Sequence, residues 1–126
     1  MEPNELLKKL PDFDDMNNVA EANAKAKGDL EQAKNLLSQE IARCIQEAMH
    51  NPDYWLDGKR PSMSYATNVI AVNGNTPEDA KILSALRDKI VELTKTYQVT
   101  KQLLNNMETI VSVWQTYSAN QRRTTL

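Results

Sequence analysis

Cysteine, histidine, glycine and aromatic residues are all scarce in this chain of 126 residues. It has one cysteine, one histidine and three glycines, and aromatics make up 6%. A lone cysteine, Cys44, cannot form an intrachain disulfide, so we expect a reducing compartment, the cytoplasm. The shortage of glycine and aromatics disfavours a barrel, and 40% hydrophobic residues disfavour a disordered chain. The composition is typical of a helix-rich soluble protein.

Long apolar runs are missing as well. A transmembrane helix needs roughly 20 apolar residues in succession, and the apolar stretches here are only a few residues long. Residues 1–9 carry no charged region followed by an apolar signal core. A chain of 126 residues fits one domain or one assembly subunit, which excludes a multidomain enzyme.

Residues that perform chemistry are too few and too scattered for catalysis. Cys44 lies on the apolar face of a predicted helix, and His50 falls on a different face of it, so the two do not have a ligand spacing. The acidic residues Asp12, Asp14 and Asp15 lack the glycine and distal glutamate of a calcium loop. No glycine-rich phosphate loop is present. We therefore expect no enzyme activity, cofactor, metal or small-molecule substrate.

The two ends of the chain carry opposite charge. Residues 1–50 hold ten acidic and six basic side chains, and residues 80–126 hold three acidic and seven basic ones. Three interpretations remain open: antiparallel packing of the two ends, head-to-tail contacts between subunits, or an anionic ligand.

The first half of the chain is predicted to be an acidic arm followed by a long helix. The arm covers residues 1–18, with a short candidate helix over 5–10. Phe13 can anchor the arm on a neighbouring subunit or fold back onto its own chain. Residues 19–126 form the helical domain, which starts with a long amphipathic helix over about 19–50 whose apolar residues repeat every three or four positions. Gly28 is its one weak interior point, which leaves the helix start uncertain by about ten residues. Asn51-Pro52 ends it.

A connection over residues 51–75 follows, longer than a bundle turn needs. Residues 62–71 are predicted to form a short helix, although 69–72 also fit an extended segment. The second long helix begins at Thr76-Pro77, where Thr76 is a good N-cap and Pro77 suits the first helical position. No proline or glycine interrupts the chain after Pro77, so the helix is predicted to run to about residue 120.

Apolar residues of the second long helix follow a strict heptad pattern with alternating spacings of three and four. This first seam consists of Leu83, Leu86, Ile90, Leu93, Tyr97, Thr100, Leu104, Met107, Val111 and Trp114. Thr100 is its single polar member, and such a residue can fix register. A second apolar line, Leu103, Ile110 and Tyr117, widens the stripe. With Trp114, this line is the predicted oligomerisation face.

Candidate nucleic-acid contacts lie in two places, the connection over residues 51–75 and the C-terminal end of the second long helix. Tyr54 and Trp55 can stack on bases, and Lys59 and Arg60 can pair with phosphates. The competing interpretation is that the aromatics plug the end of the hairpin while Asp57-Gly58 forms a turn.

The C-terminal pair Arg122 and Arg123 also has two interpretations. The two arginines can contact phosphate or complement the negative end of the helix dipole.

The order of these segments resembles a known family. The chain has a long N-terminal helix, an aromatic pair leading to Gly58-Lys59, a serine-containing short segment and a long C-terminal helix with polar and basic residues at its end. Across about residues 29–123 this layout is similar to the UvsY-type recombination mediators of tailed phages. The basic run that the family carries before its aromatic pair is absent here, since residues 46–50 are neutral to acidic.

The resemblance implies a ring-shaped homo-oligomer that binds single-stranded DNA and helps to load a RecA-like recombinase in a phage-infected cell. DNA contacts would fall on Lys59 and Arg60, and also on Tyr54 and Trp55. We expect an all-α, elongated antiparallel helical hairpin with a coiled-coil-like C-terminal helix, forming a homo-oligomer. The alternative function is a helical structural or adaptor protein, such as a virion assembly factor or a protein-binding inhibitor, with no nucleic-acid binding.

Overall fold

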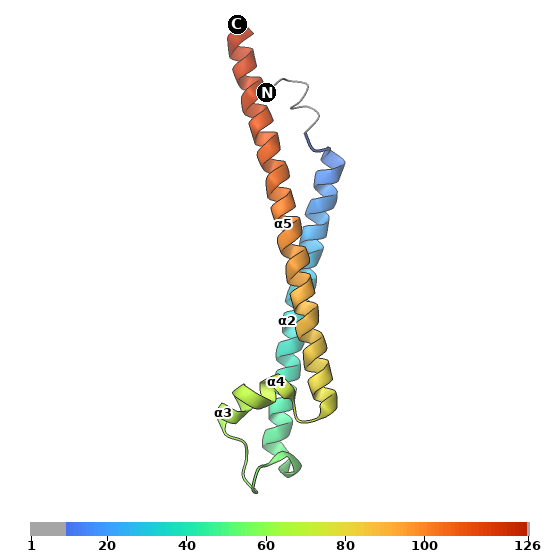
Figure 1. Ribbon diagram of the computed structural model, residues 1–126, viewed down its shortest axis with the longest axis vertical. Helices are drawn as coiled ribbons and strands as arrows, with labels where there is room; N and C mark the ends of the chain where they lie inside the picture. Colours follow the sequence, from blue (N-terminus) through green and yellow to red (C-terminus); the bar gives the residue numbers. More distant parts are fainter. Residues whose placement is uncertain (1–9, 126) are drawn as a thin grey trace. The chain divides into compact units, whose positions relative to one another are not determined.

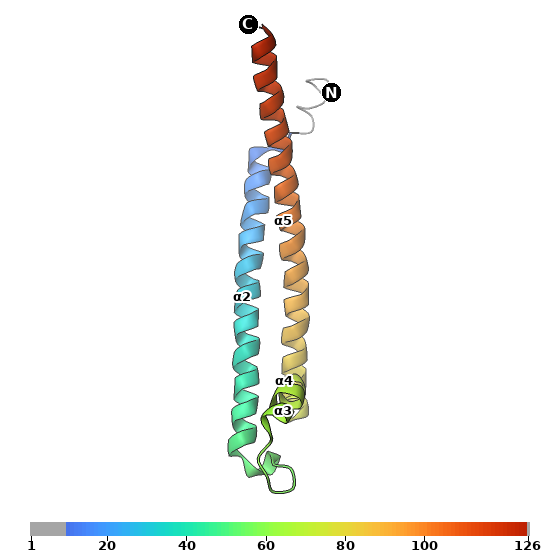
Figure 2. The ribbon, with the colours of Figure 1, turned by 90° about the vertical axis from the view of Figure 1, so that its left-hand side faces the viewer.

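Two long helices form an antiparallel hairpin, which confirms the all-α prediction. The computed structural model describes residues 10–125, and side chains over residues 10–123. Helix α2 spans Phe13–His50 and α5 spans Pro77–Thr125. Both views of the ribbon show the two helices side by side, joined through the short helical segments of the connection (Figures 1 and 2). No helix in the described part of the chain is long and apolar enough to cross a membrane.

Helix α2 begins at Phe13, earlier than residue 19, where the sequence predicted it. Asp14 and Asp15 therefore lie in its first turn, where negative charge complements the positive end of the helix dipole. The helix passes through Gly28 without a break. Phe13 is 74% exposed on the described subunit, and its contact with a neighbouring subunit stays a prediction. Residues 1–9, which include most of the candidate helix over 5–10, lie outside the described part of the chain.

The predicted stop after His50 is confirmed. The backbone N–H of Asn51 donates to the carbonyl oxygen of Glu47 at 2.8 Å and closes the last turn of α2. The side-chain oxygen of Asn51 then accepts a hydrogen bond from the N–H of Asp53 at 3.0 Å. This bond caps the 3₁₀-helix η1, Pro52–Tyr54, so one asparagine both ends one helix and starts the next.

The short helix of the connection is observed and extends beyond its predicted end. Ser62 caps it, its hydroxyl accepting from the N–H of Tyr65 at 3.1 Å. The chain continues through α3 (Met63–Tyr65), a π-helical segment η2 (Ala66–Ile70) and α4 (Ala71–Asn73). The helical conformation excludes the extended alternative for residues 69–72. Gly74, with φ of 64°, ends the segment in a conformation that side chains rarely adopt.

Helix α5 starts at the predicted cap and runs past its predicted end to Thr125. The hydroxyl oxygen of Thr76 accepts a hydrogen bond from the N–H of Asp79 at 3.1 Å. All ten residues of the first seam are buried or half-buried. At its polar position, Thr100 Oγ1 accepts from Asn23 Nδ2 at 2.9 Å, and the same amide nitrogen donates to the Tyr97 carbonyl at 3.0 Å. The first seam is therefore the face that α5 turns to α2.

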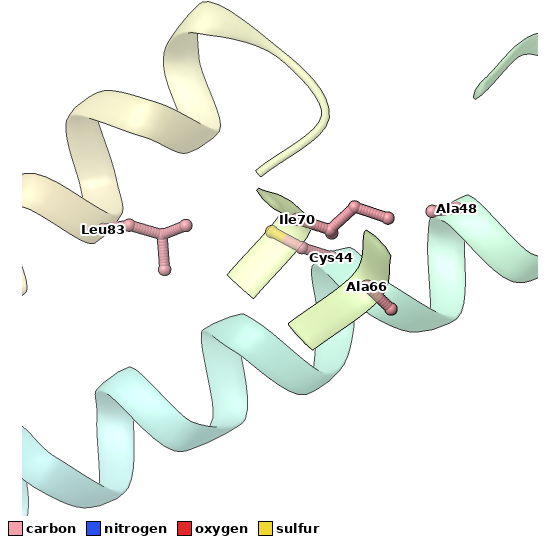
Figure 3. Close-up of a cluster of buried hydrophobic side chains, with 5 residues drawn as sticks. All are labelled: Cys44, Ala48, Ala66, Ile70 and Leu83. Atoms are coloured by element: carbon pink, nitrogen blue, oxygen red, sulfur yellow. The ribbon is translucent and has the colours of Figure 1, made fainter. Parts of the chain in front are cut away.

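The chain divides into two compact units: residues 1–27 with 95–126, and residues 28–94. In the second unit, five fully or almost fully buried side chains form a core cluster: Cys44, Ala48, Ala66, Ile70 and Leu83. They come from α2, η2 and α5, so the short helix of the connection supplies two of the five (Figure 3). The length of the connection is explained by this packing role.

Candidate functional site

The predicted DNA-contacting loop is a rigid hairpin turn. Leu56 and Lys59 exchange two backbone hydrogen bonds of 3.1 and 3.0 Å. Between them, Asp57 and Gly58 have φ values of 53° and 73°. Positive φ at both central residues defines the type I′ turn, for which Asp-Gly is one of the preferred sequences. The turn interpretation of Asp57-Gly58 is thus confirmed, and the turn fixes where Lys59 and Arg60 leave the backbone.

The two aromatics before the turn are engaged in packing. Trp55 is half-buried, and its indole Nε1–H donates to the carbonyl oxygen of Ala48 at 3.1 Å. That carbonyl belongs to the last turn of α2, where such oxygens have no partner within the helix. Tyr54 is half-buried and packs against the core cluster. Both residues therefore seal the end of α2.

The two cations after the turn are exposed. The Arg60 guanidinium lies over the Trp55 ring, 5.4 Å from its centroid, at a distance where a cation–π interaction is favourable. The structure thus brings Trp55 and Arg60 together, with Lys59 next to them in the chain. Arg122 and Arg123 lie in the last turn of α5, where positive charge complements the helix dipole. They belong to the other compact unit.

The four residues predicted for oligomerisation lie along the C-terminal half of α5. Leu103 is 44% exposed, whereas Ile110, Trp114 and Tyr117 are half-buried. Trp114 belongs to the first seam, and the other three form the adjacent line. The side chains of this line are therefore accessible on the described subunit.

A polar cluster centred on Arg43 was not predicted from the sequence. Arg43 on α2 forms ion pairs with Glu40, with Glu47 at 2.7 Å and with Asp79 at 2.7 Å. Asp79 is buried at the start of α5. The bond between Arg43 and Asp79 joins two helices through residues 36 positions apart. The Arg43 cluster therefore fixes the start of α5 against α2.

Asn75 completes this junction. Its side-chain nitrogen donates to the carbonyl of Cys44 at 2.7 Å, and its backbone N–H donates to Asp79 Oδ2 at 3.0 Å. Burial alone would raise the pKa of Asp79, but hydrogen bonds from Arg43, Asn75 and Thr76 lower it below its ordinary value. The carboxylate is therefore ionised at neutral pH and tightly held.

Ligand atoms of Glu40, Cys44 and Asp79 lie within 4.8 Å of one another, a grouping that a metal ion could in principle use. Two features of these residues argue for an ion-pair network instead. Arg43 already donates hydrogen bonds to both carboxylates. Burial raises the pKa of the Cys44 thiol to about 11, whereas a metal ligand must be the thiolate. The same raised pKa makes Cys44 a poor nucleophile at neutral pH.

One sequence signal could have indicated part of this cluster. Thr76 and Asp79 have the spacing of a capping box, in which the acidic side chain turns back to the backbone before the helix. The sequence interpretation used Asp79 only as a charge for the helix dipole. Its pairing with Arg43 depends on the register of the two helices, which no local pattern defines.

Comparison of the chain with protein-family models, with curated proteins and with solved structures gives no match.

Proposed function

We propose that the protein is a non-enzymatic, oligomeric accessory protein that binds single-stranded DNA and acts as a phage-type recombination mediator, helping a RecA-like recombinase. The observation that carries the proposal is the rigid type I′ turn that presents exposed Lys59 and Arg60 beside Trp55. A guanidinium has five N–H donors around its planar rim, so stacking on an indole leaves donors for phosphate oxygens. Lys59 adds a second point of positive charge for the same strand.

The order of elements supports the same proposal. A long helix, an aromatic pair with a glycine-lysine turn, a serine-capped short helix and a long C-terminal helix follow one another, as the resemblance to UvsY-type mediators implies. In this proposal, Tyr54 and Trp55 do not contact bases but hold the turn against the end of α2. Backbone phosphates are then the main contacts, which suits binding without sequence preference.

The test is fluorescence anisotropy of a labelled single strand of about 30 nucleotides, titrated at low and at physiological salt, with a duplex as control. Replacing Lys59→Ala together with Arg60→Ala should weaken binding roughly tenfold at low salt. The slope of log affinity against log salt should become shallower by about 1.4, since each lost phosphate contact on a single strand contributes about 0.7.

A matched control is the pair Lys25→Ala and Lys27→Ala, which removes the same charge from exposed positions on α2. These variants should bind as the unmodified protein does. Equal weakening by both pairs would show that total charge matters and that the turn is not the site. No binding by the unmodified protein even at low salt would overturn the proposed function.

A second candidate is a helical structural or adaptor protein, such as a virion assembly factor or a protein-binding inhibitor. The observation that favours it is the engagement of both loop aromatics, since the Trp55 indole bonds to Ala48 and Tyr54 packs on the core cluster. Base stacking then has no free platform in the loop. This function would use the line of Leu103, Ile110 and Tyr117 for protein contacts, and its test is capture of a protein partner that an Ile110→Asp variant fails to bind.

A further inference from the structure

Helix α5 carries a second heptad seam beside the first. It runs through Val99, Leu103, Asn106, Ile110, Val113, Tyr117 and Asn120, with spacings that alternate between four and three. From Leu103 to Val113, each member directly precedes a member of the first seam. One residue corresponds to about 100° around a helix, so the two seams lie on adjacent faces of α5. The first seam faces α2, and the second seam forms a separate face of α5.

The second seam is exposed on the described subunit. Val99 is 65% exposed, Val113 52% and Leu103 44%, while Ile110 and Tyr117 are half-buried. A shallow groove at its C-terminal end is lined by Ser112, Val113, Thr116, Tyr117 and Asn120. In both ribbon views the C-terminal part of α5 continues past the start of α2 (Figures 1 and 2). Over about three heptads, an apolar line therefore lacks a partner within the described residues.

Charge on this face is arranged for pairing with an identical helix. Between residues 99 and 120 the charged side chains are Lys101 and Glu108. Both occupy the heptad position farthest from the second seam. The positions that flank it on one side are Gln102, Thr109 and Thr116, all uncharged. An in-register contact between two copies thus places no like charges opposite each other, so the face is electrostatically compatible with itself.

We infer that the second seam of α5 binds the second seam of another copy of this chain as a parallel, in-register coiled coil. This inference rests on the oligomeric part of the proposed function and assigns its contact surface. Asn106 supports the parallel orientation, because parallel pairing places Asn106 opposite Asn106 and Ile110 opposite Ile110. In such a pair the two amides can hydrogen-bond to each other, because each has a donor and an acceptor. Antiparallel pairing would put Asn106 opposite Tyr117 and Asn120 opposite Leu103, leaving amides against apolar or aromatic groups.

The first test is the mass of the particle by sedimentation equilibrium. Val113→Asp places a carboxylate in the second seam, and Val91→Asp is the matched control. Both valines lie on α5 with almost equal exposure, 52% and 51%, but Val91 lies on neither seam. The particle mass of the unmodified protein should be a multiple of the 14.3 kDa of one chain. Val113→Asp should weaken association at least about 100-fold, while Val91→Asp should leave the mass unchanged.

The second test is the direction of pairing. A cysteine in Val99→Cys faces its own copy in a parallel pair, but lies about 38 Å from it along the axis in the antiparallel one, at 1.5 Å per residue. Mild oxidation should therefore yield a covalent dimer. The unmodified protein, whose Cys44 is buried, is the control and should yield none. Absence of the crosslink in an assembled particle would overturn the parallel arrangement.

The two sets of variants separate this inference from the DNA-binding proposal. A monomeric unmodified protein, or a Val113→Asp variant with unchanged mass, overturns the second seam as the self-association face. Neither result depends on DNA. Conversely, loss of DNA binding in the turn variants with an unchanged particle mass leaves the second seam supported.

Discussion

At the residue scale, Asp79 makes stability depend on pH. Its pKa in the folded protein lies below the ordinary value of 3.8. The ionised carboxylate therefore stabilises the fold fully above about pH 5, and this contribution is lost as the pH falls through 3.8 towards the folded-state pKa. The interactions that weaken on protonation are those of the Asp79 carboxylate with Arg43 and Asn75.

Asp79→Asn should lower the free energy of unfolding at pH 7 by about 1–3 kcal/mol, because Arg43 loses a buried partner. The variant should also show a smaller loss of stability between pH 5 and pH 3 than the unmodified protein. Thermal melts followed by circular dichroism across this range measure both effects. Asp88→Asn, at an exposed position of the same helix, is the control, and equal behaviour of the two variants would contradict the role of Asp79.

Gly74 lies where no other residue fits. Its φ of 64° and ψ of −160° are a combination that is essentially restricted to glycine. A Cβ on Gly74 would lie 2.2 Å from the Cβ of Asp79. Gly74→Ala should therefore destabilise the protein by about 2–4 kcal/mol, measured by urea denaturation. A loss below about 1 kcal/mol would mean that the turn before α5 can relax.

At the element scale, Gly28 is the contrasting glycine. It lies in the middle of α2, is exposed, and a Cβ built on it meets nothing within 4 Å. Gly28→Ala should raise the free energy of unfolding by about 1 kcal/mol, because alanine loses less backbone entropy in a helix. The melting temperature should rise by about 4 °C. A decrease would indicate that a partner approaches α2 at this position.

Local patterns predicted the helices well because their causes are local. The heptad spacing, the Thr76-Pro77 cap and the Asn51-Pro52 stop each act within a few residues, and each has its predicted effect. The start of α2 was missed by six residues because the acidic stretch before residue 19 was assigned to the arm, whereas Asp14 and Asp15 suit the first turn of a helix.

The sequence also revealed only part of the accessible face of α5. Leu103, Ile110 and Tyr117 stand out because they are large and apolar. The other members of the second seam are two valines and two asparagines, and their common heptad line becomes evident only when the burial of the first seam shows which face is already used. The Arg43 cluster was missed for a related reason, since its partners meet only in the folded hairpin.

At the scale of the whole molecule, the antiparallel packing that the opposite charges of the two ends suggested is observed, as α2 and α5 run along each other. The ion pair of Arg43 with Asp79 places the base on α2 and the acid on α5, the reverse of the overall charge pattern. Head-to-tail contacts between subunits and an anionic ligand stay predictions. The few glycines and prolines lie mainly in and around the 51–75 connection, and Gly28, the glycine inside a long helix, does not break α2.

The hairpin also orders the events of folding. Arg43 and Asp79 are separated by 36 positions in the chain, whereas Asn23 and Thr100 are separated by 77. Closing a loop costs more entropy as the loop lengthens, so we expect the contacts next to the connection to form first and the helices then to join towards their far ends. Defects around Cys44 and Leu83 should therefore slow folding, while defects at Asn23 or Thr100 should mainly speed unfolding. We therefore expect folding to begin at the long connection, which supplies two side chains to the core cluster.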